Sequence, residues 1–238
     1  MRKVVKKGLL CLMLSGVLTF SVAGCGKSTD SEQVTEQVVD SKIETLFTDS
    51  NKIYKDISSI SLSLDIKSEN GNVNLNLKSD NNGVYREGTV NDKVVKIYND
   101  LENKVNYSYN SDKVTWFLSE NSFKFDIKSI GSLDFSSMYD KLTIKEGKFN
   151  KEDVYLVCGA FTGYDLDVIS SQVDVKLSDY LVSKDEVVNV DLFFRKEDSR
   201  LLGIQLKPSE NNNYSLLIDF KDINNFKFEV PSDVVEKE

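Results

Sequence analysis

Apolar and polar residues alternate in two neighbouring stretches of the chain. Residues 60–67, ISLSLDIK, place Ile or Leu at every second position, and residues 72–79, NVNLNLKS, alternate in the same way after the turn sequence SENG. Successive side chains of a strand point to opposite faces, so each stretch predicts a strand with one buried and one solvated face. Together the two stretches predict a β-hairpin.

Further short runs rich in β-branched and aromatic residues continue towards the C-terminus, separated by turns of Asn, Asp, Gly and Lys. They cover residues 83–90, 93–99, 104–110, 113–119, 122–128, 141–147, 153–161, 186–208, 214–224 and 226–231. Short strands at this spacing predict an antiparallel meander. The two prolines, Pro208 and Pro231, fall where strands would end, so neither interrupts a ladder.

Three stretches have helical periodicity instead. In the first, apolar residues recur three and four positions apart, at Val39, Ile43, Leu46, Phe47, Ile53 or Tyr54, and Ile57. This spacing predicts an amphipathic helix. Helical patterns also occur at 131–142 and 164–181, although the β-branched residues of the last stretch leave a local strand as the alternative.

Residues 1–24 have the layout of a secretory signal: Arg2, Lys3, Lys6 and Lys7 precede an apolar core, and small residues precede Cys25. The apolar core of about 16 residues is shorter than the roughly 20 that a permanent membrane helix needs, so we expect it to be removed. Gly26-Lys27-Ser28 also matches the end of a phosphate-binding loop. That loop requires Gly at position 21, where this chain has Ser, and a preceding core strand, which the pattern lacks.

The residues Val22-Ala23-Gly24-Cys25 resemble the lipobox of bacterial lipoprotein precursors. The resemblance implies cleavage between Gly24 and Cys25 and a diacylglycerol group on the Cys25 sulfur. An ordinary signal, or an uncleaved anchor that happens to contain a Cys, is the alternative. We therefore expect a signal peptide at 1–24, a lipidated Cys with a flexible tether at 25–36, and a single domain at 37–238, held on the extracytoplasmic face of the cell membrane.

Composition narrows the chemistry further. The full chain has a net charge of −8, and without residues 1–24 it carries 26 Lys and Arg against 38 Asp and Glu, a net charge of −12. A surface of this sign disfavours nucleic acid as a partner. The chain contains no His, which excludes Ser-His-Asp and Cys-His catalysis and His-bearing zinc sites. A glycosidase with two carboxylates stays open, but no pair stands out, and we expect no catalytic residue, metal or cofactor.

Cysteine usage fits an exported lipoprotein. Cys11 leaves with the signal and Cys25 receives lipid, so only Cys158 remains and no internal disulfide can form. The apolar neighbours of Cys158 in VYLVCGAF predict a small buried side chain. An intermolecular disulfide that joins a homodimer is the alternative.

The order of helix, long meander, helical excursion and closing hairpins, with the ending FKFEVPSDVV, resembles the extracytoplasmic lipoproteins related to the lipoprotein carriers of Gram-negative bacteria (LolA-like). The resemblance implies an α+β fold in which one long curved antiparallel sheet forms an incomplete barrel. It also implies an N-terminal helix and one or two central helices on the concave face, around an apolar cavity for acyl chains or a partner's hydrophobic segment. An anchored chain cannot ferry cargo freely, so the carrier activity itself does not transfer.

Large aromatic residues are the candidates for lining such a cavity. They are Trp116, Phe117, Phe123, Phe125, Phe135 and Phe193. The alternative is that they form ordinary core. Trp116 ranks first, because Phe117 must point to the opposite face of the same strand.

Two non-enzymatic functions follow from these observations. One is a lipoprotein that binds a lipid or acyl chain, and the other is an anchored adaptor for a cell-envelope protein such as a cell-wall hydrolase. The abundance of Lys, Asn, Asp, Ile and Ser suggests an AT-rich bacterial genome, and a Gram-positive origin fits the lipobox resemblance and the lack of disulfides.

Overall fold

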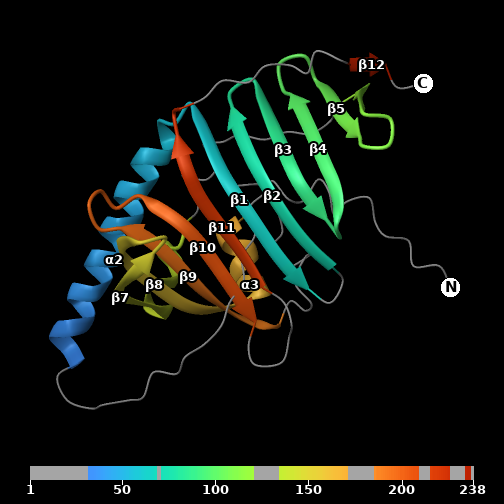
Figure 1. Ribbon diagram of the computed structural model, residues 1–238. Helices are drawn as coiled ribbons and strands as arrows, with labels where there is room; N and C mark the ends of the chain where they lie inside the picture. Colours follow the sequence, from blue (N-terminus) through green and yellow to red (C-terminus); the bar gives the residue numbers. More distant parts are fainter. Residues whose placement is uncertain are drawn as a thin grey trace.

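The computed structural model in Figure 1 describes residues 32–68, 71–120, 134–170, 185–208, 215–225 and 234–236. The helices are α2 (Glu32–Lys55), the 3₁₀ helix η2 (Ser136–Lys141) and α3 (Gly163–Ser170). The strands are β1 (Ser59–Ser68), β2 (Gly71–Asp80), β3 (Gly83–Val90), β4 (Lys93–Asp100), β5 (Val105–Asn110), β6 (Thr115–Glu120), β7 (Leu142–Phe149), β8 (Glu152–Thr162), β9 (Val187–Arg195), β10 (Leu201–Pro208), β11 (Ser215–Ile223) and β12 (Val234–Glu236).

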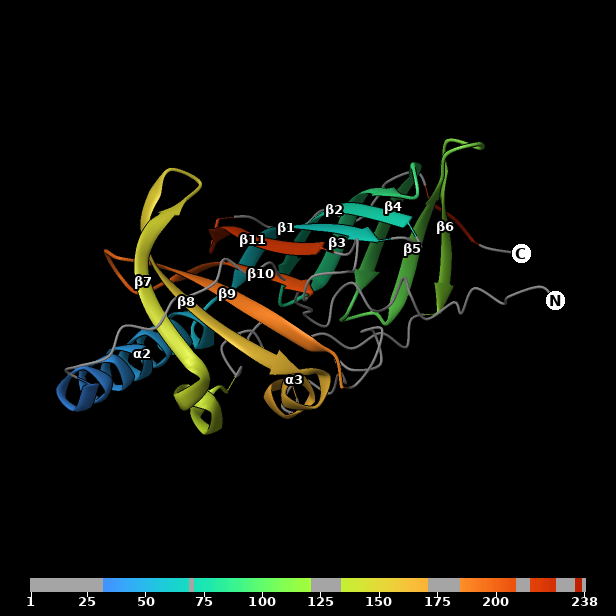
Figure 2. The same ribbon diagram turned by 90° about the horizontal axis from the view of Figure 1, so that it is seen from below.

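The described strands form one open sheet in the order β12-β6-β5-β4-β3-β2-β1-β11-β10-β9-β8-β7. Two meanders, β1–β6 and β7–β11, meet where β1 pairs with β11 at the middle of the sheet. All neighbours are antiparallel except β12, which pairs with β6 in parallel. The curved, unclosed sheet of Figure 2 confirms the predicted α+β half-barrel.

The predicted first hairpin is confirmed residue by residue. Leu62 of β1 lies opposite Leu77 of β2, and Leu64 lies opposite Leu75, so the apolar positions of both strands share one face. Their polar positions, such as Ser63 and Asn76, share the other. A shift of one residue would expose every apolar side chain, so the alternation itself fixes this register.

The helices pack on this apolar face, which we call the core face. Phe47 of α2 stacks on Phe135 beside η2, with ring centroids 4.9 Å apart, and meets Phe194 of β9 edge to face at 5.1 Å. Leu166 of α3 and the buried residues of β8–β11, β1 and β2 join the same cluster. The helices predicted at the N-terminus and in the middle of the chain are therefore confirmed, and Figure 1 shows α3 behind the sheet.

The boundaries of the predicted elements differ in detail. Helix α2 begins at Glu32, inside the stretch 25–36 that the sequence suggested as a tether. Glu and Gln are good helix formers, and acidic residues are favoured in a first turn. The predicted strands at 122–128 and 226–231, and the second half of the helical stretch 164–181, lie outside the described residues.

A second, smaller apolar cluster lies on the opposite, outer face of the sheet. The ring of Phe149, at the tip of the β7–β8 hairpin, stacks on Phe193 of β9 with centroids 4.3 Å apart. Gly203 of β10 leaves room for this approach, since a Cβ there would lie 2.7 Å from the Phe149 ring. Asn150 donates a hydrogen bond of 3.0 Å to Asp219 of β11. Figure 2 shows the bend of β7 that brings the hairpin turn to the side away from α2 and α3.

Tyr54 anchors the end of α2 to the sheet. Its hydroxyl donates to the Leu201 carbonyl oxygen at 2.5 Å, and the Leu201 N–H donates to Ser50 Oγ at 3.2 Å. Burial raises the pKa of Tyr54 well above its usual value of 10. The folded state therefore favours the neutral phenol. The stability gained in this way is fully present below about pH 10 and is lost as the pH rises further.

Tyr54→Phe is expected to lower the free energy of unfolding by about 1–2 kcal/mol at pH 8, because the Leu201 carbonyl loses its partner. At pH 11 the difference in unfolding free energy between the variant and the wild type should shrink. The unfolded wild type is stabilised at that pH by ionisation of its Tyr54 phenol, whereas the variant has no phenol at this position. Urea unfolding at both pH values measures the change. Tyr164→Phe is the control because Tyr164 is 69% exposed. If its difference from the wild type in unfolding free energy changes between pH 8 and pH 11 as much as that of Tyr54→Phe, the pH effect does not come from the buried Tyr54.

Candidate functional site

The core face changes character between β2 and β3. On β1 and β2 it is apolar, and Leu77 of β2 lies opposite Arg86 of β3. Asn99 of β4, Asn106 of β5 and Ser108 of β5 lie on the same face by register. We call these four polar residues the Arg86 row.

Hydrogen bonds link the four residues of the Arg86 row, and each residue donates to the next one. A guanidinium N–H of Arg86 donates to the Asn99 side-chain oxygen. The Asn99 amide then donates to Asn106 Oδ1 at 3.1 Å, and the Asn106 amide donates to Ser108 Oγ at 3.1 Å. Because a guanidinium can only donate, it fixes the orientation of each amide in turn.

The row is buried and its charge is positive. Arg86 is 4% exposed and Asn99 is 3% exposed. By register, the core face of the described strands β3–β6 carries Arg86 and Lys93 and no Asp or Glu. A guanidinium stays protonated in proteins, so this part of the sheet presents a fixed positive charge in a chain that is otherwise acidic.

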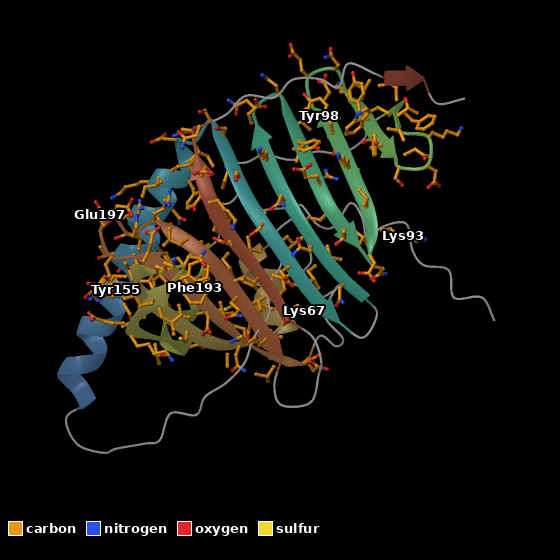
Figure 3. All side chains as sticks on the ribbon, viewed as in Figure 1. Lys67, Lys93, Tyr98, Tyr155, Phe193 and Glu197 are labelled. Carbon is orange, nitrogen blue, oxygen red and sulfur yellow. The ribbon has the colours of Figure 1, made fainter. Side chains whose placement is uncertain are left out.

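The outer face of the same strands carries aromatic side chains. We call Tyr85, Tyr98, Tyr107, Tyr109 and Trp116 the tyrosine face. Tyr98 stacks on Tyr107 at 5.6 Å, and Trp116 lies 5.4 Å from Tyr109 and 6.5 Å from Tyr85. Burial raises the pKa of Tyr85 and of Tyr98 to about 12, with Glu87 and Asp100 adding to the respective effects. Tyr98 and, farther along the sheet, Phe193 are labelled in Figure 3.

The aromatic residues predicted to line a cavity do not gather in one place. Trp116 and Phe193 lie on the outer face, in the tyrosine face and under the β7–β8 hairpin respectively. Phe117 lies on the core face opposite Ser108, and Phe135 is buried between α2 and β8.

The remaining predicted site residues are Phe123, Phe125, Gly24 and Cys25, and they lie outside the described residues. The ligand-binding role of the six aromatic residues and the lipidation of Cys25 stay predictions. The expectation that Trp116 and Phe117 point to opposite faces of one strand agrees with the register of β6.

Sequence reasoning missed Arg86, although a signal was present. In GVYREGTV, alternation places Arg86 in phase with Val84 and Val90, which are apolar. An arginine at an inward position of an alternating strand is unusual, because burying a charge is costly unless it is hydrogen-bonded or paired.

Cys158 of β8 lies opposite Asp191 of β9, on the outer face. Burial, assisted by the nearby Asp191 carboxylate, raises the pKa of the Cys158 thiol to about 12. Disulfide formation proceeds through the thiolate, so this environment slows it. The homodimer joined through Cys158 stays a prediction.

Two features are absent from the described part of the chain. None of its helices is both long enough and apolar enough to cross a membrane. Nor do its Cys, Asp and Glu side chains gather in threes in a way that could hold a metal ion.

Comparison with known proteins identifies the fold alone. No protein-family model and no curated protein sequence matches the chain. Among solved structures, LprF from Mycobacterium bovis has a TM-score of 0.54 at 9% identity, over 82% of this chain and 98% of LprF. The lipoprotein LppX from Mycobacterium tuberculosis has a TM-score of 0.53 at 9% identity, over 79% of this chain and 98% of LppX.

Proposed function

We propose that this chain, which shares its fold with LprF and the lipoprotein LppX, is the precursor of a lipid-anchored extracytoplasmic lipoprotein that binds an apolar ligand. The ligand is a lipid or acyl chain, held on the core face of the half-barrel. The observation that carries the proposal is an open sheet with one apolar face, on which the described helices pack against β1, β2 and β7–β11. The protein acts by binding, and the proposal includes no catalytic step.

The N-terminal sequence supports the anchored position. Six residues, 26–31, separate Cys25 from Glu32, where α2 begins. A fully extended chain of that length spans at most about 20 Å. Anchoring at Cys25 would therefore hold the start of α2 close to the bilayer, within reach of membrane lipids.

Native mass spectrometry of the full-length protein, extracted from membranes in mild detergent, tests the binding function. Lipid that survives denaturation is covalent and reports the anchor, whereas lipid that is lost on denaturation is ligand. We expect both. A protein that carries only the covalent lipid, and that takes up no added fatty acid or phospholipid, would contradict the binding function.

The tyrosine face supports the second candidate, an adaptor for another cell-envelope protein. Tyr and Trp are enriched at protein interfaces, and Tyr85, Tyr107 and Tyr109 are only partly buried. A protein that binds no lipid but is cross-linked to one envelope protein through this face would favour the adaptor over lipid binding.

A further inference from the structure

We infer that β12 is exchanged between two copies of this chain, because its connection to β11 is too short for easy pairing within one copy. The interaction surface is the edge of β6 that faces away from β5, and its partner is β12 of a second copy. The inference concerns the assembly of the protein and does not depend on what the core face binds.

The first support is the strand that occupies this edge. The three residues of β12 pair in parallel with Trp116–Leu118 of β6. The same three residues of a second copy would make the same hydrogen bonds, so the exchange loses no pairing. Without β12 the edge of β6 would present a row of unpaired N–H and C=O groups, so it favours being filled.

The second support is the distance that the chain has to cover within one copy. Strands β11 and β12 are seven strand positions apart in the sheet order, and Figure 1 shows them on either side of β1–β5. At about 4.8 Å between neighbouring strands, the path along the sheet is about 34 Å, which the curvature of the sheet shortens in part. Ten residue steps join Asn224 to Val234, and a fully extended chain of that length spans at most about 33–36 Å. Pairing within one copy therefore leaves this connection little slack.

The third support is that the start of the connection is fixed. The Asn224 N–H donates to the Ser59 carbonyl oxygen at 2.8 Å, and the Asn224 side-chain oxygen accepts from the Ser58 backbone N–H at 2.6 Å. Within one copy the sheet sets the distance from there to β6, whereas a second copy can bring its β6 closer. A short connection under strain favours the exchange of an element between copies. Parallel pairing over only three residues does little to oppose it.

Co-expression of two full-length variants tests the exchange. One carries Leu118→Cys and the other Glu236→Cys, each with its own affinity tag and with Cys158→Ala. These two positions lie opposite each other in the register of β6 and β12. We expect mild oxidation to give a disulfide-linked heterodimer with both tags. Its yield should exceed that of the control pair Lys78→Cys and Glu236→Cys by about tenfold, because a disulfide requires Cα atoms within about 7 Å.

Lengthening the connection tests the cause. Six Gly and Ser residues inserted after Asn225 relieve the strain, so β12 should pair within its own copy and the heterodimer should decrease by about fivefold or more. The same insertion after Glu197, in the exposed turn between β9 and β10 (Figure 3), is the matched control. It should leave the heterodimer unchanged.

Three results would overturn the inference: no heterodimer above the control pair, a heterodimer that the insertion after Asn225 leaves unchanged, or Leu118→Cys linked to another envelope protein instead. The last result would assign the edge of β6 to the adaptor function. If the cysteine variants fail to fold, light scattering of the detergent-extracted wild type under reducing conditions decides. A dimer that the insertion after Asn225 converts to monomer supports the exchange, and a wild type that is monomeric at every concentration overturns it.

Discussion

Phe194→Ala is expected to lower the free energy of unfolding by about 3–5 kcal/mol, the range found when a large buried aromatic is truncated. Phe194 is fully buried on the core face and meets Phe47 of α2 edge to face. Its removal leaves a cavity between the sheet and α2 that neighbouring side chains cannot fill without moving. Since a domain has roughly 5–15 kcal/mol of stability in total, this one change should remove a large part of it. Urea unfolding followed by circular dichroism measures the loss.

Phe193→Ala is the matched control. Phe193 is the next residue along β9, points to the outer face and is 8% exposed beneath Phe149. It belongs to a cluster of three buried residues, whereas Phe194 belongs to the main core. Phe193→Ala should therefore lower the free energy of unfolding by less than Phe194→Ala does. If it costs as much as Phe194→Ala or more, the main core does not lie on the helix-covered face.

The fold could be predicted from the sequence because apolar and polar residues alternate regularly in strands of which one face is solvated. In β1 and β2 every inward position is Ile, Leu or Val, apart from Ser79 and the two residues beside the turn, Ser68 and Gly71, so strand type, register and buried face follow together. The spacing of Ile43, Leu46 and Phe47 likewise identifies the face of α2 that packs on the sheet. The short strand β12 has only three residues and pairs in parallel across a long sequence separation. No local pattern predicts such a pairing.

The candidate site was less predictable because both faces of β3–β6 carry side chains of mixed character. In VTWFLS, either Trp116 or Phe117 could have lain on the core face, and only the register through β5 to β3 decides that Phe117 does. The Arg86 row joins three strands through pairings that alternation alone does not fix. A prediction based on large aromatic residues therefore found core and outer-face residues, and it passed over the polar residues of the core face.

Cys25→Ala is expected to abolish membrane anchoring. The lipobox resemblance implies that the Cys25 sulfur is the point of attachment of diacylglycerol, and alanine has no atom to accept it. Two acyl chains hold a protein on a bilayer stably, at about 0.8 kcal/mol for each buried CH₂, whereas one chain binds only marginally.

The measurement is phase partitioning in a detergent that separates on warming, combined with intact mass. Wild-type protein should enter the detergent phase with the mass of residues 25–238 plus lipid, and Cys25→Ala should be released or should accumulate as the precursor. Cys158→Ala is the control, because it removes the other cysteine of the mature chain and should partition as the wild type does. On non-reducing gels this control also tests the predicted dimer. If Cys25→Ala still partitions wholly into detergent, or if the wild type retains Met1 and a bare Cys25 thiol, the protein is not held by lipid at this residue.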